Sequence, residues 1–157
     1  MHSEEVKNLR LNYIVNVLDG AFFGFGLGFA SFATVIPLFV STMTDSAILI
    51  GLITAVHLMG WQVPQLLTAQ SVSRMARFKP TVMWMTIHER LPFLGLALIA
   101  LFYFKIGTLP AILLTFAMLV WQGFGAGFTA NAWQNMIGKV IPSDYLATFF
   151  GVQSSAA

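Results

Sequence analysis

The chain has 157 residues, of which 57% are apolar and only 9% are charged, and its mean hydropathy is +0.79. This composition leaves too little polar surface for a soluble domain and predicts a protein embedded in a lipid bilayer. A formal charge of +2 and the lack of cysteine argue against nucleic-acid binding, disulfide frameworks and thiolate metal sites. The histidines at positions 2, 57 and 88 lack the spacing of metal ligands, so we expect no metal and no cofactor.

Four stretches of the chain are long enough to cross a bilayer, which takes about 20 mostly apolar residues. They lie at residues 13–40, 48–70, 80–104 and 108–136. A fifth apolar segment starts at about residue 146 and is too short to cross before residue 157, so we expect a truncated fifth helix. The sequence therefore predicts an all-α, polytopic transmembrane helical bundle, organised as one partial domain over residues 1–157.

The basic residues predict the orientation of this bundle. The connections between spans are short, so neighbouring helices must run antiparallel. Lys105 is the one basic residue expected on the outer side. Apart from Arg90 within the third span, the other basic side chains fall on the N-terminal side of the membrane: Lys7, Arg10, Arg74, Arg77, Lys79 and Lys139. Because positive charge concentrates in cytoplasmic loops, we expect a multi-pass protein of the cell membrane with a cytoplasmic N-terminus.

The first span carries polar residues on one face. Asn12, Asn16 and Asp19 are spaced by four and three residues and so form one helical stripe. An ionised Asp19 facing lipid is costly, so this residue is a candidate for substrate binding or ion coupling, the alternative being an interfacial Asp that caps or snorkels. Gly20, Gly24 and Gly28 favour close approach of another helix.

The second and fourth spans contribute further polar candidates. A seam along the second span consists of Thr54, His57, Trp61, Gln65 and Thr68. It either lines a translocation path or hydrogen-bonds across a helix interface, and His57 is its ionisable member. Gln122 is the most interior polar side chain of the fourth span, as a substrate contact or as an amide bonded to a neighbouring helix. The glycines between Gly123 and Gly127 indicate close packing.

The third span contains the most costly charges. Glu89 and Arg90 lie about 15 Å along the helix from its start, near the middle of a bilayer. Adjacent residues point about 100° apart, so each needs a partner elsewhere, and Asp19 lies at a depth that would let it pair with Arg90. Asp19, His88 and Glu89 are candidates for coupling proton movement to transport.

Two motifs resemble those of the major facilitator superfamily. Its loop between helices two and three has a Gly, three residues, Asp-Arg, one residue and Gly-Arg. The run from Ala69 to Lys79 matches both arginines, Arg74 and Arg77, with Ser73 at the Asp position and alanine at both glycines. Its drug antiporters carry an Arg, two residues, Gln-Gly, one residue and Gly-Ala in helix four. Here Gln122, Gly123, Gly125 and Ala126 match, and Leu119 stands for the Arg.

The resemblance implies a secondary transporter that moves a small-molecule solute by alternating access, with helices one and four lining the site. The chain would then be the N-terminal portion of such a protein, with the missing helices supplied by the same transporter or by an oligomeric partner. A second hypothesis is a small four-helix oligomeric membrane protein, either an exporter or an assembly subunit. A membrane enzyme using His88 and Glu89 lacks a converging nucleophile, base and orienting group, so we expect no enzyme activity.

Overall fold

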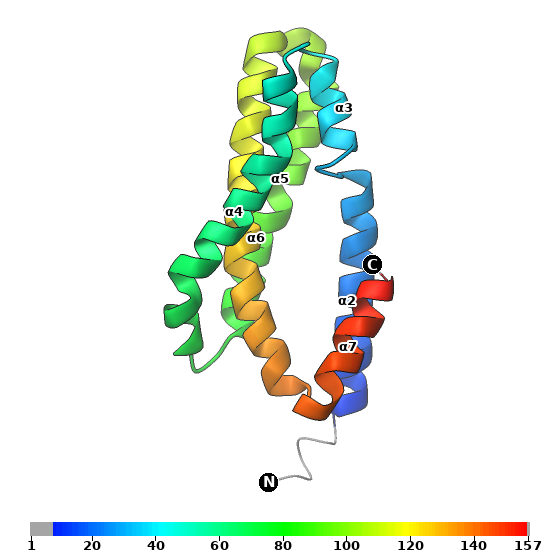
Figure 1. Ribbon diagram of the computed structural model, residues 1–157, viewed down its shortest axis with the longest axis vertical. Coiled ribbons are helices and arrows are strands. Elements are labelled where there is room, and N and C mark those ends of the chain that lie inside the picture. The colour runs from blue at the N-terminus through cyan, green and yellow to red at the C-terminus, as the bar shows by residue number, and fades with distance from the viewer. Residues whose placement is uncertain (1–7, 157) are drawn as a thin grey trace. The chain divides into compact units, whose positions relative to one another are not determined.

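The computed structural model describes residues 8–156, and this part of the chain is helical, with short turns between the helices (Figure 1). Its helices are α2 (Leu9–Phe29), α3 (Val35–Ser41), α4 (Ala47–Ser73), α5 (Lys79–Ile106), α6 (Thr108–Val140) and α7 (Ser143–Ala156). Three of these helices, α4, α5 and α6, are long and apolar enough to cross a membrane. The predicted all-α class is confirmed, together with three of the predicted apolar spans.

The predicted first span, residues 13–40, is wrong as a single helix. α2 ends at Phe29 and α3 begins at Val35, with a turn over residues 30–34. The Oγ of Ser31 accepts hydrogen bonds from the N–H groups of Ala33 (3.3 Å) and Thr34 (3.2 Å). Such local side-chain bonds offer the backbone an alternative to the helical ladder, which explains the break.

The two helices of this region differ from a single membrane span. Pro37 lies in the first turn of α3, where backbone N–H groups have no intrahelical acceptor, so a proline is tolerated there. α2 carries Asn12, Asn16 and Asp19, and it is not one of the three helices apolar enough to cross by itself. The apolar run from 13 to 40 therefore forms two helices, α2 and the short α3, instead of one span.

Short connections join the three apolar helices, as predicted. The Oγ of Ser46 accepts a hydrogen bond from the Leu49 N–H (3.4 Å) and caps the start of α4. One residue, Gly107, separates α5 from α6, and its φ of 83° lies in the left-handed region that glycine adopts without strain. Its N–H closes α5 on the carbonyl of Tyr103. These turns make α4, α5 and α6 successive antiparallel hairpins.

The chain forms two compact units. One, the α2–α7 unit, comprises the chain up to Phe29 and from Gln134 onward. The other, the α4–α6 unit, comprises Ala30–Trp133 and contains α3, α4, α5 and most of α6.

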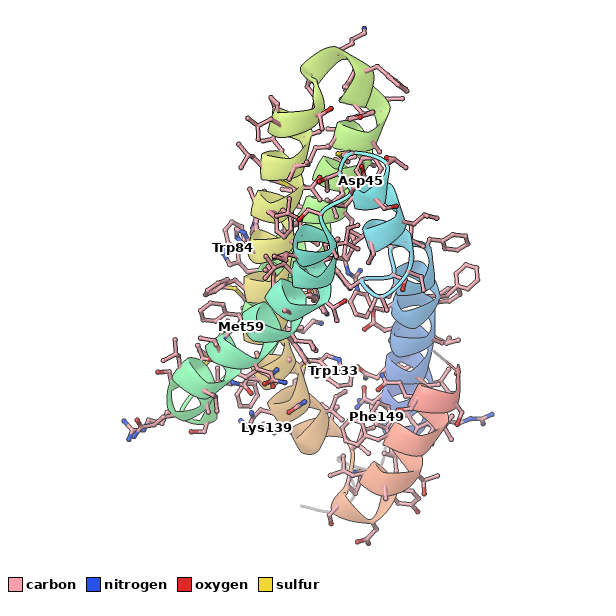
Figure 2. All side chains as sticks on the ribbon, turned by 45° about the horizontal axis from the view of Figure 1, so that its top comes forward. Asp45, Met59, Trp84, Trp133, Lys139 and Phe149 are labelled. Atoms are coloured by element: carbon pink, nitrogen blue, oxygen red, sulfur yellow. The ribbon has the colours of Figure 1, made fainter. Side chains whose placement is uncertain are left out.

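In the α2–α7 unit, the two helices lie side by side (Figure 1). The rings of Tyr13 and Phe149 meet edge to face with centroids 5.5 Å apart, and Figure 2 labels Phe149 on α7. Gln153 Nε2 donates to the Asn16 carbonyl (3.0 Å), and its side chain fills the space that a Cβ at Gly20 would need. Gly20 thus serves close packing, as predicted.

In the α4–α6 unit, α6 is the central helix. Half of its most apolar segment is buried, against 17% in α4 and in α5. A Cβ at Gly60 of α4 would lie 2.9 Å from the Cα of Gly123. A Cβ at Gly125 would lie 2.6 Å from the backbone carbon of His88 in α5. The glycines of α6 therefore allow close backbone approach on two sides, which confirms the packing predicted for this run.

The outer faces of α4 and α5 are apolar. Met59 of α4 is 66% exposed and Trp84 of α5 is 59% exposed, and both project away from the neighbouring helices (Figure 2). A buried cluster of Ile36, Val40, Ile53 and Leu119 joins α3, α4 and α6 on the inside. An apolar surface outside and a packed core inside suit a helix group surrounded by lipid.

Candidate functional site

Two predicted site residues, His57 of α4 and Gln122 of α6, meet in the α4–α6 unit. His57 Nδ1 and Gln122 Oε1 are 3.0 Å apart, and Gln122 is 1% exposed. Because an amide oxygen only accepts, the imidazole donates through Nδ1 in this contact, which leaves Nε2 of the neutral ring as an acceptor. The pair places an ionisable ring and an amide among three apolar helices.

The turn between α2 and α3 covers this pair. The ring of Phe32 is stacked on the imidazole of His57, with centroids 3.7 Å apart and planes 8° apart. The carbonyl of Phe32 accepts a hydrogen bond from Thr54 Oγ1 (2.9 Å). The ring of Phe93 in α5 also contacts the Phe32 ring, with centroids 6.0 Å apart. The break in the predicted first span is thus attached to the polar pair by one stack and one hydrogen bond.

A second histidine, His88, is held between two tryptophans. Trp121 Nε1 of α6 donates to His88 Nδ1 (3.3 Å), and Trp84 meets the imidazole edge to face at 5.4 Å. Because an indole N–H only donates, His88 Nδ1 must accept, so the ring proton of this neutral histidine is on Nε2. The sequence offered no signal for this partner, since 33 residues separate the two side chains.

The buried face of α6 carries three polar residues at intervals of seven: Thr115, Gln122 and Thr129. Thr129 Oγ1 donates to the Gly125 carbonyl (2.8 Å), whereas the fully buried hydroxyl of Thr115 has no hydrogen-bond partner within residues 8–156. A seven-residue interval is close to two helical turns, so these side chains lie on one stripe of about 21 Å along the helix. We call it the polar stripe of α6.

The C-terminal part of the predicted α4 seam, at Gln65 and Thr68, is hydrogen-bonded within α4 and to α6. Asn131 Nδ2 of α6 donates to the Gln65 carbonyl (2.6 Å) and to Thr68 Oγ1 (3.0 Å). Thr68 Oγ1 in turn donates to the Pro64 carbonyl (2.6 Å), and Gln65 Nε2 donates to the Trp61 carbonyl (2.9 Å). Hydrogen bonds within and between helices therefore account for the polar residues at this end of the seam. The His57–Gln122 pair lies toward its N-terminal end.

The charged candidates occupy different places. Glu89 is buried on α5, where its backbone N lies 2.7 Å from the position of a Cβ at Gly125. Arg90 is exposed on α5, and Asp19 is exposed on α2 in the other unit. The proposed Asp19–Arg90 pair stays a prediction.

The two motif arginines lie in the α4–α5 connection. Arg74 caps the end of α4, and Arg77 follows it before α5 begins at Lys79. All three basic side chains, Arg74, Arg77 and Lys79, are exposed at the surface of the protein. Over the residues that the structure covers, no group of three or more histidine or acidic side chains is placed to hold a metal ion.

The fold and the site define a helical protein with three candidate membrane spans and a polar pair inside one of its units. Comparisons with family models, with curated proteins and with solved structures give no match to this chain. The all-α class, with three candidate membrane spans, therefore rests on the helices of the structure. The major facilitator assignment stays a prediction from the two motifs.

Proposed function

We propose that this chain is part of a secondary transporter of the major facilitator type that moves a small solute by alternating access. The proposal includes a multi-pass topology with a cytoplasmic N-terminus, and further helices of the transporter or of a partner to complete the pathway. The observation that carries it is the hydrogen-bonded pair of His57 and Gln122 among three apolar helices. An ionisable group in such surroundings is expensive and generally serves function.

Two further features support a transport path. The polar stripe of α6 extends the polar character along the helix in both directions from Gln122, and Thr115 contributes a buried hydroxyl without a hydrogen-bond partner in residues 8–156. The helix break at residues 30–34 lies directly on the pair. Transporter sites are commonly formed by interrupted helices, because unwound backbone supplies polar groups inside the membrane.

The chemistry of this site suits exchange of partners. The Gln122 amide and the His57 imidazole each offer donors and acceptors, and they bond to one another at 3.0 Å. A solute with polar groups would replace this mutual bond with bonds to itself, so neither side chain would be left unsatisfied in either state. Glu89, buried on α5, and His57 are the proposed groups for proton coupling.

The 157-residue sequence contains no cysteine, so a cysteine introduced into it is unique within it. We would introduce Gln122→Cys into the protein in its native membrane and apply a membrane-impermeant thiol reagent from each face in turn. Alternating access predicts reaction from both faces, because the site opens to each side in separate states. Val120→Cys on the same helix is the matched control, since Val120 is 44% exposed on an apolar surface and should react slowly from either face.

The results separate the candidate functions. Reaction of Gln122→Cys from both faces, with protection by a transported solute, supports alternating access. Reaction from neither face would contradict it and favour a small oligomeric membrane protein in which the His57–Gln122 pair only fastens α4 to α6. Reaction from a single face would indicate a closed-ended binding site instead of a transport path.

A further inference from the structure

Phe32 lies in the turn between α2 and α3, and its ring contacts the His57–Gln122 pair. Within residues 8–156, it is the one aromatic residue of this turn with such a contact. Its ring covers the flat face of the His57 imidazole at 3.7 Å. At the edge of the same imidazole, Nδ1 is hydrogen-bonded to Gln122. Removing the Phe32 ring would therefore uncover the histidine without breaking its hydrogen bond.

The turn that carries Phe32 has few hydrogen bonds to α4. It lies outside both helices, between Phe29 and Val35. The N–H groups of Ala33 and Thr34 donate to Ser31 Oγ, and the carbonyls of Ser31 and Thr34 accept from the N–H groups of Ile36 and Leu38 in α3. The hydrogen bond to α4 is the one that Thr54 Oγ1 donates to the Phe32 carbonyl. Because these bonds join the turn to α3, the turn and α3 can move as one segment once the bond from Thr54 breaks, with the change in backbone angles at the start of the turn, which is the behaviour of a hinge.

The position of the turn defines which side it closes. The turn contacts α4 at His57 and at Thr54, one helical turn nearer the Thr42–Ser46 connection, and α3 continues from the turn to that connection, so the turn and α3 together cover the pair on the side of the membrane face that carries this connection. We call this the α3–α4 face. α3 packs on α4 and α6 through Ile36, Ile53 and Leu119, which holds the turn over the pair.

We propose that Phe32 is a gate residue that closes the His57–Gln122 site toward the α3–α4 face. This inference rests on the proposed function, because it names the group that opens one end of the same site. Opening requires the Phe32 ring to leave the imidazole and the Thr54–Phe32 hydrogen bond to break. α3 and the turn then move together away from α4.

The test measures the accessibility of Gln122→Cys, the one cysteine in this 157-residue sequence, in the native membrane. The reagent is a membrane-impermeant maleimide applied from one face at a time. Phe32→Ala should raise the reaction rate from the α3–α4 face by about two- to tenfold, the range that an aromatic pair is worth, and leave the rate from the opposite face unchanged. Phe29→Ala is the matched control, because Phe29 is the same residue type three positions earlier and is 71% exposed.

A second variant tests closure directly. Thr54→Val keeps the Phe32 ring but removes the hydroxyl that donates to the Phe32 carbonyl at 2.9 Å. Since opening requires this bond to break, Thr54→Val should also raise labelling of Gln122→Cys from the α3–α4 face and leave the rate from the opposite face unchanged. Mass spectrometry of the reporter peptide identifies the labelled site.

The outcomes distinguish the gate from the proposed function. The gate is overturned if Phe32→Ala leaves the rate from the α3–α4 face unchanged, if Phe29→Ala raises it equally, or if Thr54→Val leaves it unchanged. Alternating access is judged separately, in the protein with Gln122→Cys alone: reaction from only one face overturns that proposal, whatever the effect of Phe32→Ala at the reactive face.

Discussion

The close approach of α5 and α6 can be tested by a single methyl group at Gly125. A Cβ there would lie 2.6 Å from the His88 carbon and 2.7 Å from the Glu89 nitrogen. Carbon atoms in good contact are about 3.5–4.0 Å apart, so the two helices would have to separate by about 1 Å. The blocking atoms belong to the backbone of α5 and cannot move aside as a side-chain tip would. Gly125→Ala therefore overpacks the interface.

The magnitude follows from two opposing effects. Overpacking of a tight interior costs about 1–3 kcal/mol, and replacing a helical glycine by alanine returns about 0.5–1 kcal/mol. The midpoints of these two ranges give a net loss of about 1 kcal/mol for Gly125→Ala, and their extremes give a loss of up to about 2.5 kcal/mol. Gly138 on the same helix has open space at its Cβ position, so Gly138→Ala should stabilise the protein by about 0.5–1 kcal/mol.

The assay is unfolding of the purified protein in mild detergent by added SDS, followed by helical circular dichroism. The two variants should shift the midpoint in opposite directions, which removes any effect of the substitution type itself. Equal shifts for both variants, or a Gly125→Ala protein as stable as the parent, would refute the inference that α5 and α6 are in backbone contact at this point.

Two further predictions concern buried hydrogen bonds. Gln153→Leu removes the donor to the Asn16 carbonyl and should lower stability by about 0.5–1.5 kcal/mol in the same assay; an unchanged midpoint would mean that the α2–α7 contact is held by apolar packing alone. Trp121→Phe removes the N–H that bonds to His88 Nδ1, so the ¹⁵N resonance of that nitrogen should shift in histidine-labelled protein. Trp84→Phe should leave this resonance nearly in place, because Trp84 contacts His88 through its ring only, and equal shifts in the two variants would contradict the assignment.

The apolar helices were well predicted by length alone. The predicted spans at 48–70, 80–104 and 108–136 correspond to α4, α5 and α6, and the largest difference is at the end of α6, which continues to Val140. A run of apolar residues between charged ends must either cross lipid or be buried, and a helix is the form that satisfies its own backbone. Local composition therefore suffices to place these elements.

The first span shows where that reasoning fails. Apolar content over residues 13–40 satisfied the length requirement, but Ser31 bonds to the following backbone N–H groups and interrupts the helix. The signals were present as Ser31 and Pro37 within the run. An average over apolar residues gives such local competition no weight, which is why the turn that carries Phe32 was missed.

By itself, the sequence determined that this protein is helical, rich in apolar spans and sparing in interior charge, and it singled out His57, Gln122, Glu89 and the α6 glycines as unusual. Only the tertiary structure decided which of them meet. His57 and Gln122 are 65 residues apart, and Phe32 reaches the imidazole through a turn, so no local pattern encodes either contact. Hydrogen bonds and ring stacks depend on the rotation and depth of one helix against another, and these are set by backbone approach at glycines such as Gly60 and Gly123.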